Sequence, residues 1–306
     1  MLFKKETRLM GNQFEFTLIT QNTSIAEELF TIAIDEIKRI EALLTTFSEQ
    51  SITYKINQNA GLKPIEVPTE VFQLIKRSQF ISKITQGAFD LSYGSIDKRF
   101  WNFDLNMTSL PDAETAKKSV ALINYENIIL DEGKQTVFLK NKGMRIGFGG
   151  IGKGYAAEMA KKKLTENNVE SGIVNASGDL SAWGFQENGE AWTIGVADPN
   201  QRKSIFSTFK ITNKAVATSG NYEKFVIINN KKYSHTIDPK TGFPISGIKS
   251  VTILADNAEI ADALATPVTV MGIEIGLDFI NQLKTIGCII IDDHDKTYFS
   301  KNITVS

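Results

Sequence analysis

The sequence is poor in the residues that most often mark metal or redox chemistry. Its 306 residues include two histidines and a single cysteine, Cys288. Cys288 stands in the apolar run Gly-Cys-Ile-Ile-Ile, which predicts a buried strand. Because the chain has no second thiol, the sequence excludes an internal disulfide framework, and we expect Cys288 to serve core packing.

The chain also lacks an excess of charge and a long apolar run. Lys and Arg number 34 against 35 Asp and Glu, a net charge of −1, so nucleic acid is not an expected partner. No stretch approaches the ~18 apolar residues that a membrane-spanning helix needs. Residues 1–8 are charged and carry no apolar leader segment. We therefore expect a cytoplasmic protein, or an extracytoplasmic one if a leader has been removed.

Periodicity predicts an α+β fold. The composition, 42% apolar and 23% charged, is typical of a soluble globular protein. Helices are expected at 24–44, 70–85, 154–167, 257–270 and 276–283, and a hairpin at 127–139. Strands are expected at 10–20, 173–174, 192–197, 207–211, 225–228, 250–254 and 288–291.

Two further features complete the predicted organisation. Ser24 is the expected N-cap of the first helix, with Glu27 as its capping-box partner. Residues 100–120 are predicted to form an insertion without regular structure. The strands come in groups rather than in βαβ alternation, which favours mostly antiparallel sheets with packed helices. No linker or repeat divides the chain, so residues 1–306 are predicted to form a single domain.

The most informative stretch is residues 233–244, YSHTIDPKTGFP, which contains His235. Histidine is the one side chain whose ordinary pKa lies near neutrality. By itself His235 would be interpreted as a hydrogen-bonded core histidine. Beside Asp238 and the polar segment 217–222 (ATSGNY), which we predict to be a turn, a site histidine is the better interpretation. His294 lies in a charged turn and is expected to be solvated.

Residues 148–155, FGGIGKGY, place four glycines and Lys153 before a predicted helix. Glycines let backbone amides approach an anion, and a helix N-terminus adds positive potential. Lys153 can meet a phosphate there as a point charge. The spacing is that of neither a Walker motif nor a dinucleotide fingerprint. A phosphate-binding loop and a plain glycine-rich turn are therefore equally good interpretations of this segment alone.

Two acidic residues complete the candidate chemistry. Asp179 ends the small-residue segment NASGD at 175–179, where an ordinary capped turn is the favoured interpretation. Asp262 and Thr266 are four residues apart on a predicted helix, so they share one face and offer hard oxygen ligands suited to Mg²⁺. An exposed Asp/Thr pair is commoner, but the surrounding alanines predict burial, and a buried Asp needs a partner.

Taken in chain order, these segments resemble the ApbE family of flavin transferases, the FAD:protein FMN transferases. Each motif is weak alone, but the ordered set is specific and spans nearly the whole chain. The matching positions are Met10 and Gly11, Thr46 and Phe47 with Ser51 and Asn57, Phe89 and Asp90, 149–155, 218–222, 235–244 and 261–266.

The resemblance implies an α+β fold related to the T-fold type and a defined reaction. In that reaction a Thr or Ser hydroxyl of an acceptor protein attacks the FMN phosphorus of FAD, and AMP leaves. It also implies that Mg²⁺ is bound by Asp262, Thr266 and a backbone carbonyl near Gly150. His235 and Asp262 are the catalytic candidates, with His235 acting as general base or as a diphosphate contact. The implied FAD site comprises Met10, Phe47, Asp90, Lys153, Asp179, Thr218, Ser219, Gly220, Tyr222 and His235.

Some positions depart from the family pattern, and other activities stay open. The departures are Asn12, Gly147, Ser177 and Pro267, where a proline inside the metal-site helix removes one amide donor. None of them replaces a candidate catalytic or metal-binding residue. The same site with water as nucleophile would be a Mg²⁺-dependent FAD pyrophosphatase that gives FMN and AMP. A non-catalytic flavin-binding protein would bind FAD and leave it intact.

Overall fold

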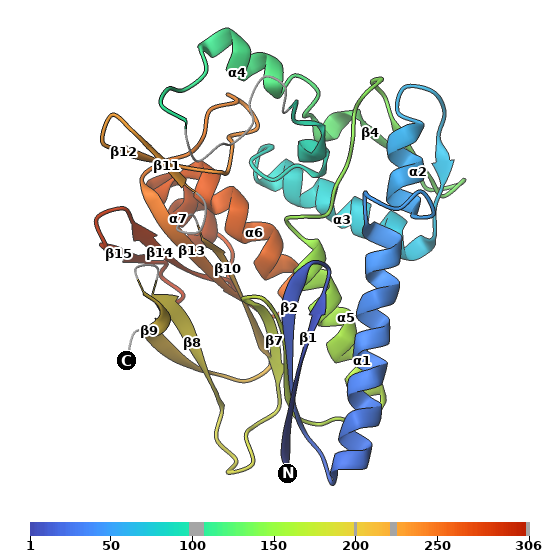
Figure 1. Ribbon diagram of the computed structural model, residues 1–306, viewed down its shortest axis with the longest axis vertical. Helices are drawn as coiled ribbons and strands as arrows, with labels where there is room; N and C mark the ends of the chain where they lie inside the picture. Colours follow the sequence, from blue (N-terminus) through green and yellow to red (C-terminus); the bar gives the residue numbers. More distant parts are fainter. Residues whose placement is uncertain (98–106, 199–200, 221–224, 304–306) are drawn as a thin grey trace.

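An eight-stranded antiparallel sheet organises the molecule (Figure 1). The computed structural model describes residues 1–97, 107–198, 201–220 and 225–303. The sheet joins strands from both ends of the chain. In spatial order its strands are β1 (Leu2–Leu9), β2 (Asn12–Ile19), β6 (Gly172–Ala176), β7 (Asp179–Trp183), β10 (Lys214–Gly220), β13 (Ile248–Ala255), β14 (Gly287–Asp292) and β15 (Thr297–Phe299).

Helices cover one face of this sheet and enclose the main core (Figure 1). Strand β2 alternates as predicted, because Phe14, Phe16 and Leu18 are fully buried. The Phe16 ring meets Phe30 of the first helix edge-on, with 6.3 Å between ring centroids. The helices are α1 (Thr23–Leu44), α3 (Thr69–Ile84), α5 (Gly152–Glu166), α6 (Ala258–Met271) and α7 (Ile273–Asn281).

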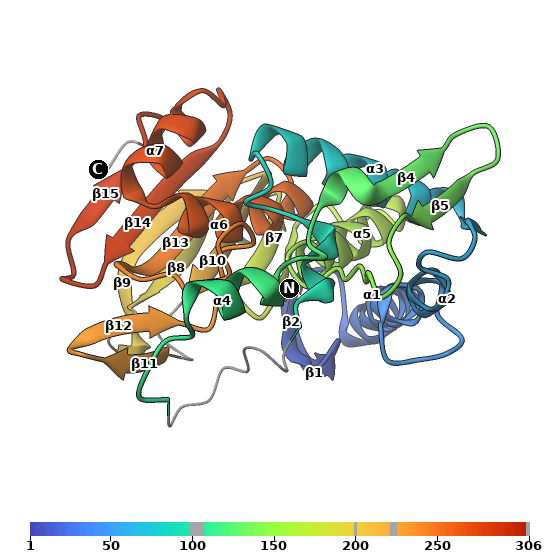
Figure 2. The same ribbon diagram turned by 90° about the horizontal axis from the view of Figure 1, so that it is seen from above.

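A hairpin covers part of the other face. Strands β8 (Trp192–Asp198) and β9 (Gln201–Ile211) pack Trp192 and Ile194 against Leu180 and Val216 of the main sheet, in a second small core. Figure 2 shows the hairpin of β4 (Ile128–Asp131) and β5 (Thr136–Leu139) beside α3. The remaining elements are α2 (Ile52–Gln58), α4 (Ala113–Ser119), β3 (Ile65–Glu66), β11 (Phe225–Ile228), β12 (Lys231–Ser234) and the 3₁₀ turns η1 (Leu91–Ser95) and η2 (Tyr125–Asn127).

The α+β class and the antiparallel sheets are confirmed, and three local predictions are wrong. The N-cap of α1 is Asn22, whose side chain accepts from the Ile25 N–H at 3.0 Å, while Glu27 pairs with Lys5. The 100–120 segment contains α4, which Asp112 caps, although residues 100–106 lie outside the described part. The predicted 217–222 turn is wrong as far as Gly220, because residues 217–220 form the end of β10; residues 221 and 222 lie outside the described part.

A chain of charged and polar contacts ties four helices together beside the core. Arg39 of α1 bonds Glu36 and Glu70, and Glu70 also accepts a bond of 2.6 Å from the Tyr155 hydroxyl of α5. The Arg39 guanidinium holds the pKa of the Glu70 carboxyl below its ordinary value. Arg77 of α3 forms a two-point pair, at 2.7 and 2.9 Å, with buried Glu259 of α6. These contacts fix the helices around the start of α5.

Helices α5 and α6 cross at Gly154 in backbone contact. A Cβ at Gly154 would lie 2.1 Å from the Ala258 carbonyl oxygen and 2.7 Å from the Asp262 Cβ, so no larger side chain fits there. Glycine is thus required by the close approach of the two helices.

We expect Gly154→Ala to lower the free energy of unfolding by about 2 kcal/mol, because the two helices must move apart. Denaturant titration followed by circular dichroism measures the change. Gly133→Ala is the matched control, since its Cβ would meet only the Asp131 side chain at an ordinary 3.5 Å. Equal unfolding midpoints for the two variants would contradict the crossing described here.

Candidate active site

Hydrogen bonds to the backbone fix the chain just before the glycine-rich loop. The side-chain amide of Asn57, in the last turn of α2, exchanges two hydrogen bonds with the backbone of Ile146, at 3.0 and 2.8 Å. The next residue, Gly147, donates its N–H to the Leu91 carbonyl at 3.0 Å. Helix α5 then begins at Gly152, two residues before the predicted start. Lys153 therefore lies in the first turn of the helix, at the positive end of the helix dipole.

Two carboxylates converge on this helix start. Asp179, buried at the beginning of β7, forms an ion pair with the Lys153 ammonium. Asp262 of α6 is also buried and accepts a hydrogen bond of 2.9 Å from the Gly154 N–H. The predicted burial of Asp262 is thus correct, and the partner it needs is the backbone of α5. For Asp179, the favoured interpretation of a plain capped turn misses its ion pair with Lys153.

The electrostatics of this cluster favour an added positive charge. Burial and the nearby Asp179 carboxylate raise the pKa of Asp262 to about 7. Burial likewise raises the pKa of Asp179, which the Lys153 ammonium opposes. Two carboxyl groups therefore share one ammonium in surroundings of low polarity, where an approaching cation would stabilise their charged forms.

Two cavities meet at the glycine-rich loop and share Gly147 and Gly149 in their walls. The first, which we call the His235 cavity, has a volume of about 380 Å³ and is also lined by Gly150, His235 and Thr266. The second, the Phe47 cavity, has a volume of about 480 Å³ and includes Met10, Phe47 and Lys153. The Phe47 side chain is 94% exposed at its rim. The structure thus brings most of the predicted site residues to two adjoining hollows.

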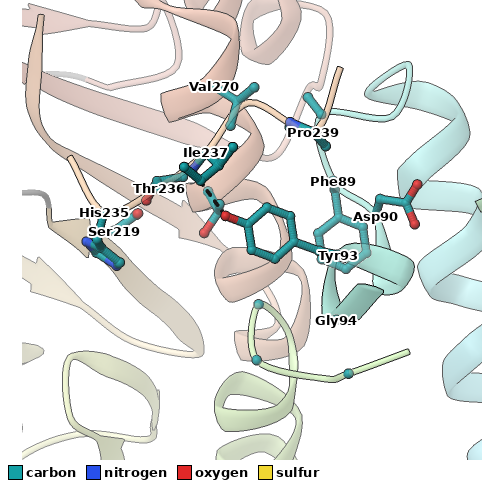
Figure 3. Close-up of a pocket in the computed structure, with 15 residues that line it drawn as sticks. Phe89, Asp90, Tyr93, Gly94, Ser219, His235, Thr236, Ile237, Pro239 and Val270 are labelled. Carbon is teal, nitrogen blue, oxygen red and sulfur yellow. Dashed lines mark hydrogen bonds between the residues drawn. The ribbon is translucent and has the colours of Figure 1, made fainter. Parts of the chain in front are cut away.

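His235 follows β12 on a loop that runs along the His235 cavity, where its exposed side chain lies beside Ser219 (Figure 3). Backbone bonds close this loop, from the Ile245 N–H to the Thr236 carbonyl at 3.0 Å and from the Asp238 N–H to the Phe243 carbonyl at 2.9 Å. The Asp238 carboxylate accepts bonds from Lys240 N–H and the Thr241 hydroxyl. Asp238 therefore shapes the turn that presents His235.

Two other predicted site residues, Asp90 and Thr218, form hydrogen bonds with neighbouring segments of the chain. The Asp90 carboxylate points away from the His235 cavity (Figure 3) and accepts bonds from Ser92 and from the Tyr125 N–H, at 2.6 to 2.8 Å. Burial raises the pKa of Asp90. Thr218 shares a hydroxyl–hydroxyl bond of 3.0 Å with Thr252 of β13. Gly220 ends β10, and Tyr222 lies outside the described residues.

The ApbE family sequence model matches residues 10–290. This chain belongs to the ApbE family. An FAD:protein FMN transferase of Klebsiella pneumoniae is 31% identical over 92% of this chain and 87% of its own length. The crystal structure of an ApbE protein from Thermotoga maritima, 27% identical, covers 98% of this chain and 97% of its own with a TM-score of 0.87. A flavin transferase ApbE structure from Vibrio cholerae, 24% identical, covers 99% and 98% with a TM-score of 0.84 and agrees in fold.

Tyr93 lines the site of this ApbE chain but was not predicted from the sequence. The Tyr93 hydroxyl lines the His235 cavity and accepts from the Ile237 N–H at 3.1 Å, a link across 144 residues that no local pattern signals. Among the described residues, no group of three or more His, Cys, Asp or Glu side chains is placed to hold a metal ion.

No helix in the described ranges is long and apolar enough to cross a membrane.

We expect Lys153→Met to lower the free energy of unfolding by about 3 kcal/mol, because it leaves Asp179 buried without its counter-charge. Denaturant titration measures the loss, and Lys153→Met with Asp179→Asn should recover part of it. Lys162→Met on the same helix is the control, since that side chain is exposed and 4.0 Å from its partner Glu166. An equal, small effect of the two single variants would contradict a buried pair.

Proposed function

We propose that this ApbE-family protein is an FAD:protein FMN transferase that moves FMN from FAD to a Thr or Ser hydroxyl of an acceptor protein. The observation that carries the proposal is the meeting of two cavities at the N-terminus of α5. FAD is an elongated dinucleotide with a charged diphosphate at its centre. A loop of glycines between two hollows suits a molecule of that shape.

The start of α5 provides the groups that a diphosphate needs. Gly149 and Gly150 have no side chains to keep phosphate oxygens from the backbone, and a Cβ at Gly149 would meet nothing within 4 Å. Lys153 adds a full positive charge in the first helical turn. The two halves of FAD would then extend into the His235 cavity and the Phe47 cavity. An aromatic side chain at the rim, Phe47, offers a stacking surface for a flavin or adenine ring.

The residues present fit a magnesium ion. Asp262 and Thr266 are one turn apart on α6, and Thr266 and Gly150 line the same cavity, so the available donors are a carboxylate, a hydroxyl and a carbonyl oxygen. Hard oxygen donors of this kind suit Mg²⁺, which shares its remaining positions with water and substrate phosphates. When bound, the ion supplies charge neutralisation for the diphosphate and the leaving group.

Three residues of the chain have distinct roles in the proposed transfer. His235, which lines the His235 cavity, would accept the proton of the acceptor hydroxyl as that oxygen attacks the FMN phosphorus. The bond from that phosphorus to the AMP oxygen breaks, so FMN stays on the acceptor as a phosphoester. Lys153 holds the diphosphate in place, and Asp179 keeps the Lys153 ammonium oriented by their ion pair.

Two finer assignments belong with this proposal. The sheet with its helices on one face is proposed to be of T-fold type, and residues 1–306 are proposed to act as one domain. Hydrolysis of FAD to FMN and AMP would use the same residues with water as nucleophile, and simple flavin binding would leave FAD intact. The three activities differ in their products.

The decisive assay mixes the protein, FAD and Mg²⁺ with a polypeptide that carries an acceptor Thr. We expect flavin fluorescence on the acceptor band after denaturing electrophoresis, abolished by EDTA. Free FMN and AMP with an unlabelled acceptor would assign a pyrophosphatase instead. Intact FAD under these conditions would contradict both catalytic activities.

Variants of the two catalytic candidates test their roles separately. We expect Asp262→Asn to lower transfer at least about a hundredfold, because it weakens metal binding. His235→Ala should lower turnover by about the same factor while FAD binding, measured by fluorescence titration, is kept. The controls are exposed Asp35→Asn on α1 and His294→Ala, which removes the other histidine. Wild-type turnover in either site variant would exclude the role assigned to that residue.

A further inference from the structure

The Tyr93 hydroxyl joins two walls of the His235 cavity that come from distant parts of the chain. Tyr93 lies on η1, and its oxygen accepts a hydrogen bond of 3.1 Å from the backbone N–H of Ile237 (Figure 3). Ile237 stands two residues after His235 on the loop that carries it. The bond therefore connects a fixed turn directly to the segment that presents the candidate general base.

The turn η1, which carries Tyr93, is fixed by an N-cap and by contacts with the backbone of residues 145 and 146. Asp90 caps η1 through Ser92, and Ser95 exchanges hydrogen bonds with the Arg145 backbone, at 2.9 and 2.7 Å. A Cβ at Gly94 would lie 3.2 Å from the Ile146 backbone, so η1 packs tightly on the chain that leads into the glycine-rich loop. Tyr93 thus projects from the turn η1, which packs on the segment that leads into the proposed diphosphate site.

Ile237, the donor of this bond, is buried. The Ile237 side chain is 2% exposed and forms a small core with Val120, against which the Tyr93 ring packs. Ile237 also bridges Pro244 across the loop, so a shift of its amide would carry both arms of the loop with it. Without the Tyr93 oxygen, this buried N–H would lose its acceptor, and the loop would gain by moving the N–H towards water.

We infer that Tyr93 is a positioning residue for His235: its hydroxyl fixes the Ile237 amide and thereby the place of the imidazole beside the glycine-rich loop. The inference rests on the proposed function, in which His235 acts on the acceptor hydroxyl. A phenylalanine would fill the same space in the small core but would offer the amide no acceptor. Burial raises the pKa of Tyr93, so the group stays a neutral hydroxyl that can accept this bond.

The test is Tyr93→Phe, which keeps the ring and removes only the hydroxyl. We expect kcat for FMN transfer to fall about 5- to 50-fold with KM for FAD within about twofold, because a small displacement of a catalytic group lowers turnover more than binding. Amide hydrogen exchange should accelerate in residues 235–238. The control is Tyr298→Phe, which loses a comparable bond of 3.1 Å, to Asp292, on edge strand β15.

A double variant separates positioning from a direct role. If Tyr93 acts through His235, adding Tyr93→Phe to His235→Ala should lower kcat no further, since coupled residues are not additive. A further loss in the double variant would overturn the inference and assign the hydroxyl a separate contact with substrate. Wild-type kcat in Tyr93→Phe, or a fall in kcat without faster exchange at 235–238, would overturn it as well.

The exchange measurement also keeps this inference distinct from the proposed function. If the wild-type protein transfers no FMN, the proposed function fails, and the exchange rates of residues 235–238 in Tyr93→Phe still decide whether the hydroxyl holds the loop. Unchanged exchange in that case would overturn the positioning role too.

Discussion

The crossing of α5 and α6 at Gly154 is the constraint on which the candidate site depends. Backbone contact at this point places the start of one helix against Asp262 of the other, so that an N–H group of α5 can reach the carboxylate directly. A helix pair separated by ordinary side chains would keep these groups several ångströms apart. The site is thus built from main chain as much as from side chains.

Charged and polar contacts between neighbouring helices hold the buried carboxylates at the crossing in place. Burying Asp179 and Asp262 beside one ammonium is unfavourable unless their positions are fixed. The Arg77–Glu259 pair anchors the first turn of α6, and the Glu70–Tyr155 bond anchors the first turn of α5. These two contacts therefore keep the starts of α5 and α6 together, although the buried carboxylates repel each other and would be more stable in water.

Sequence patterns predicted the parts of this arrangement that repeat locally. The alternation in β2 followed from its period of two, the burial of Asp262 followed from the surrounding alanines, and the ordered motifs indicated the family. The Asn22 cap was missed because Asn22, Thr23 and Ser24 can all cap a helix. The end of β10 was missed because Thr218, Ser219 and Gly220 are also typical of turns. Contacts such as Lys153 with Asp179, or Tyr93 with Ile237, join distant segments and leave no local pattern.

We propose that a dinucleotide diphosphate and its metal ion bind at the N-terminus of α5. A crystal structure with FAD and Mg²⁺ tests it most directly. We expect the diphosphate against the glycine-rich loop, with the two halves of FAD in the His235 and Phe47 cavities and the ion on Asp262, Thr266 and the Gly150 carbonyl. FAD bound away from this loop, or an ion held without Asp262, would contradict it.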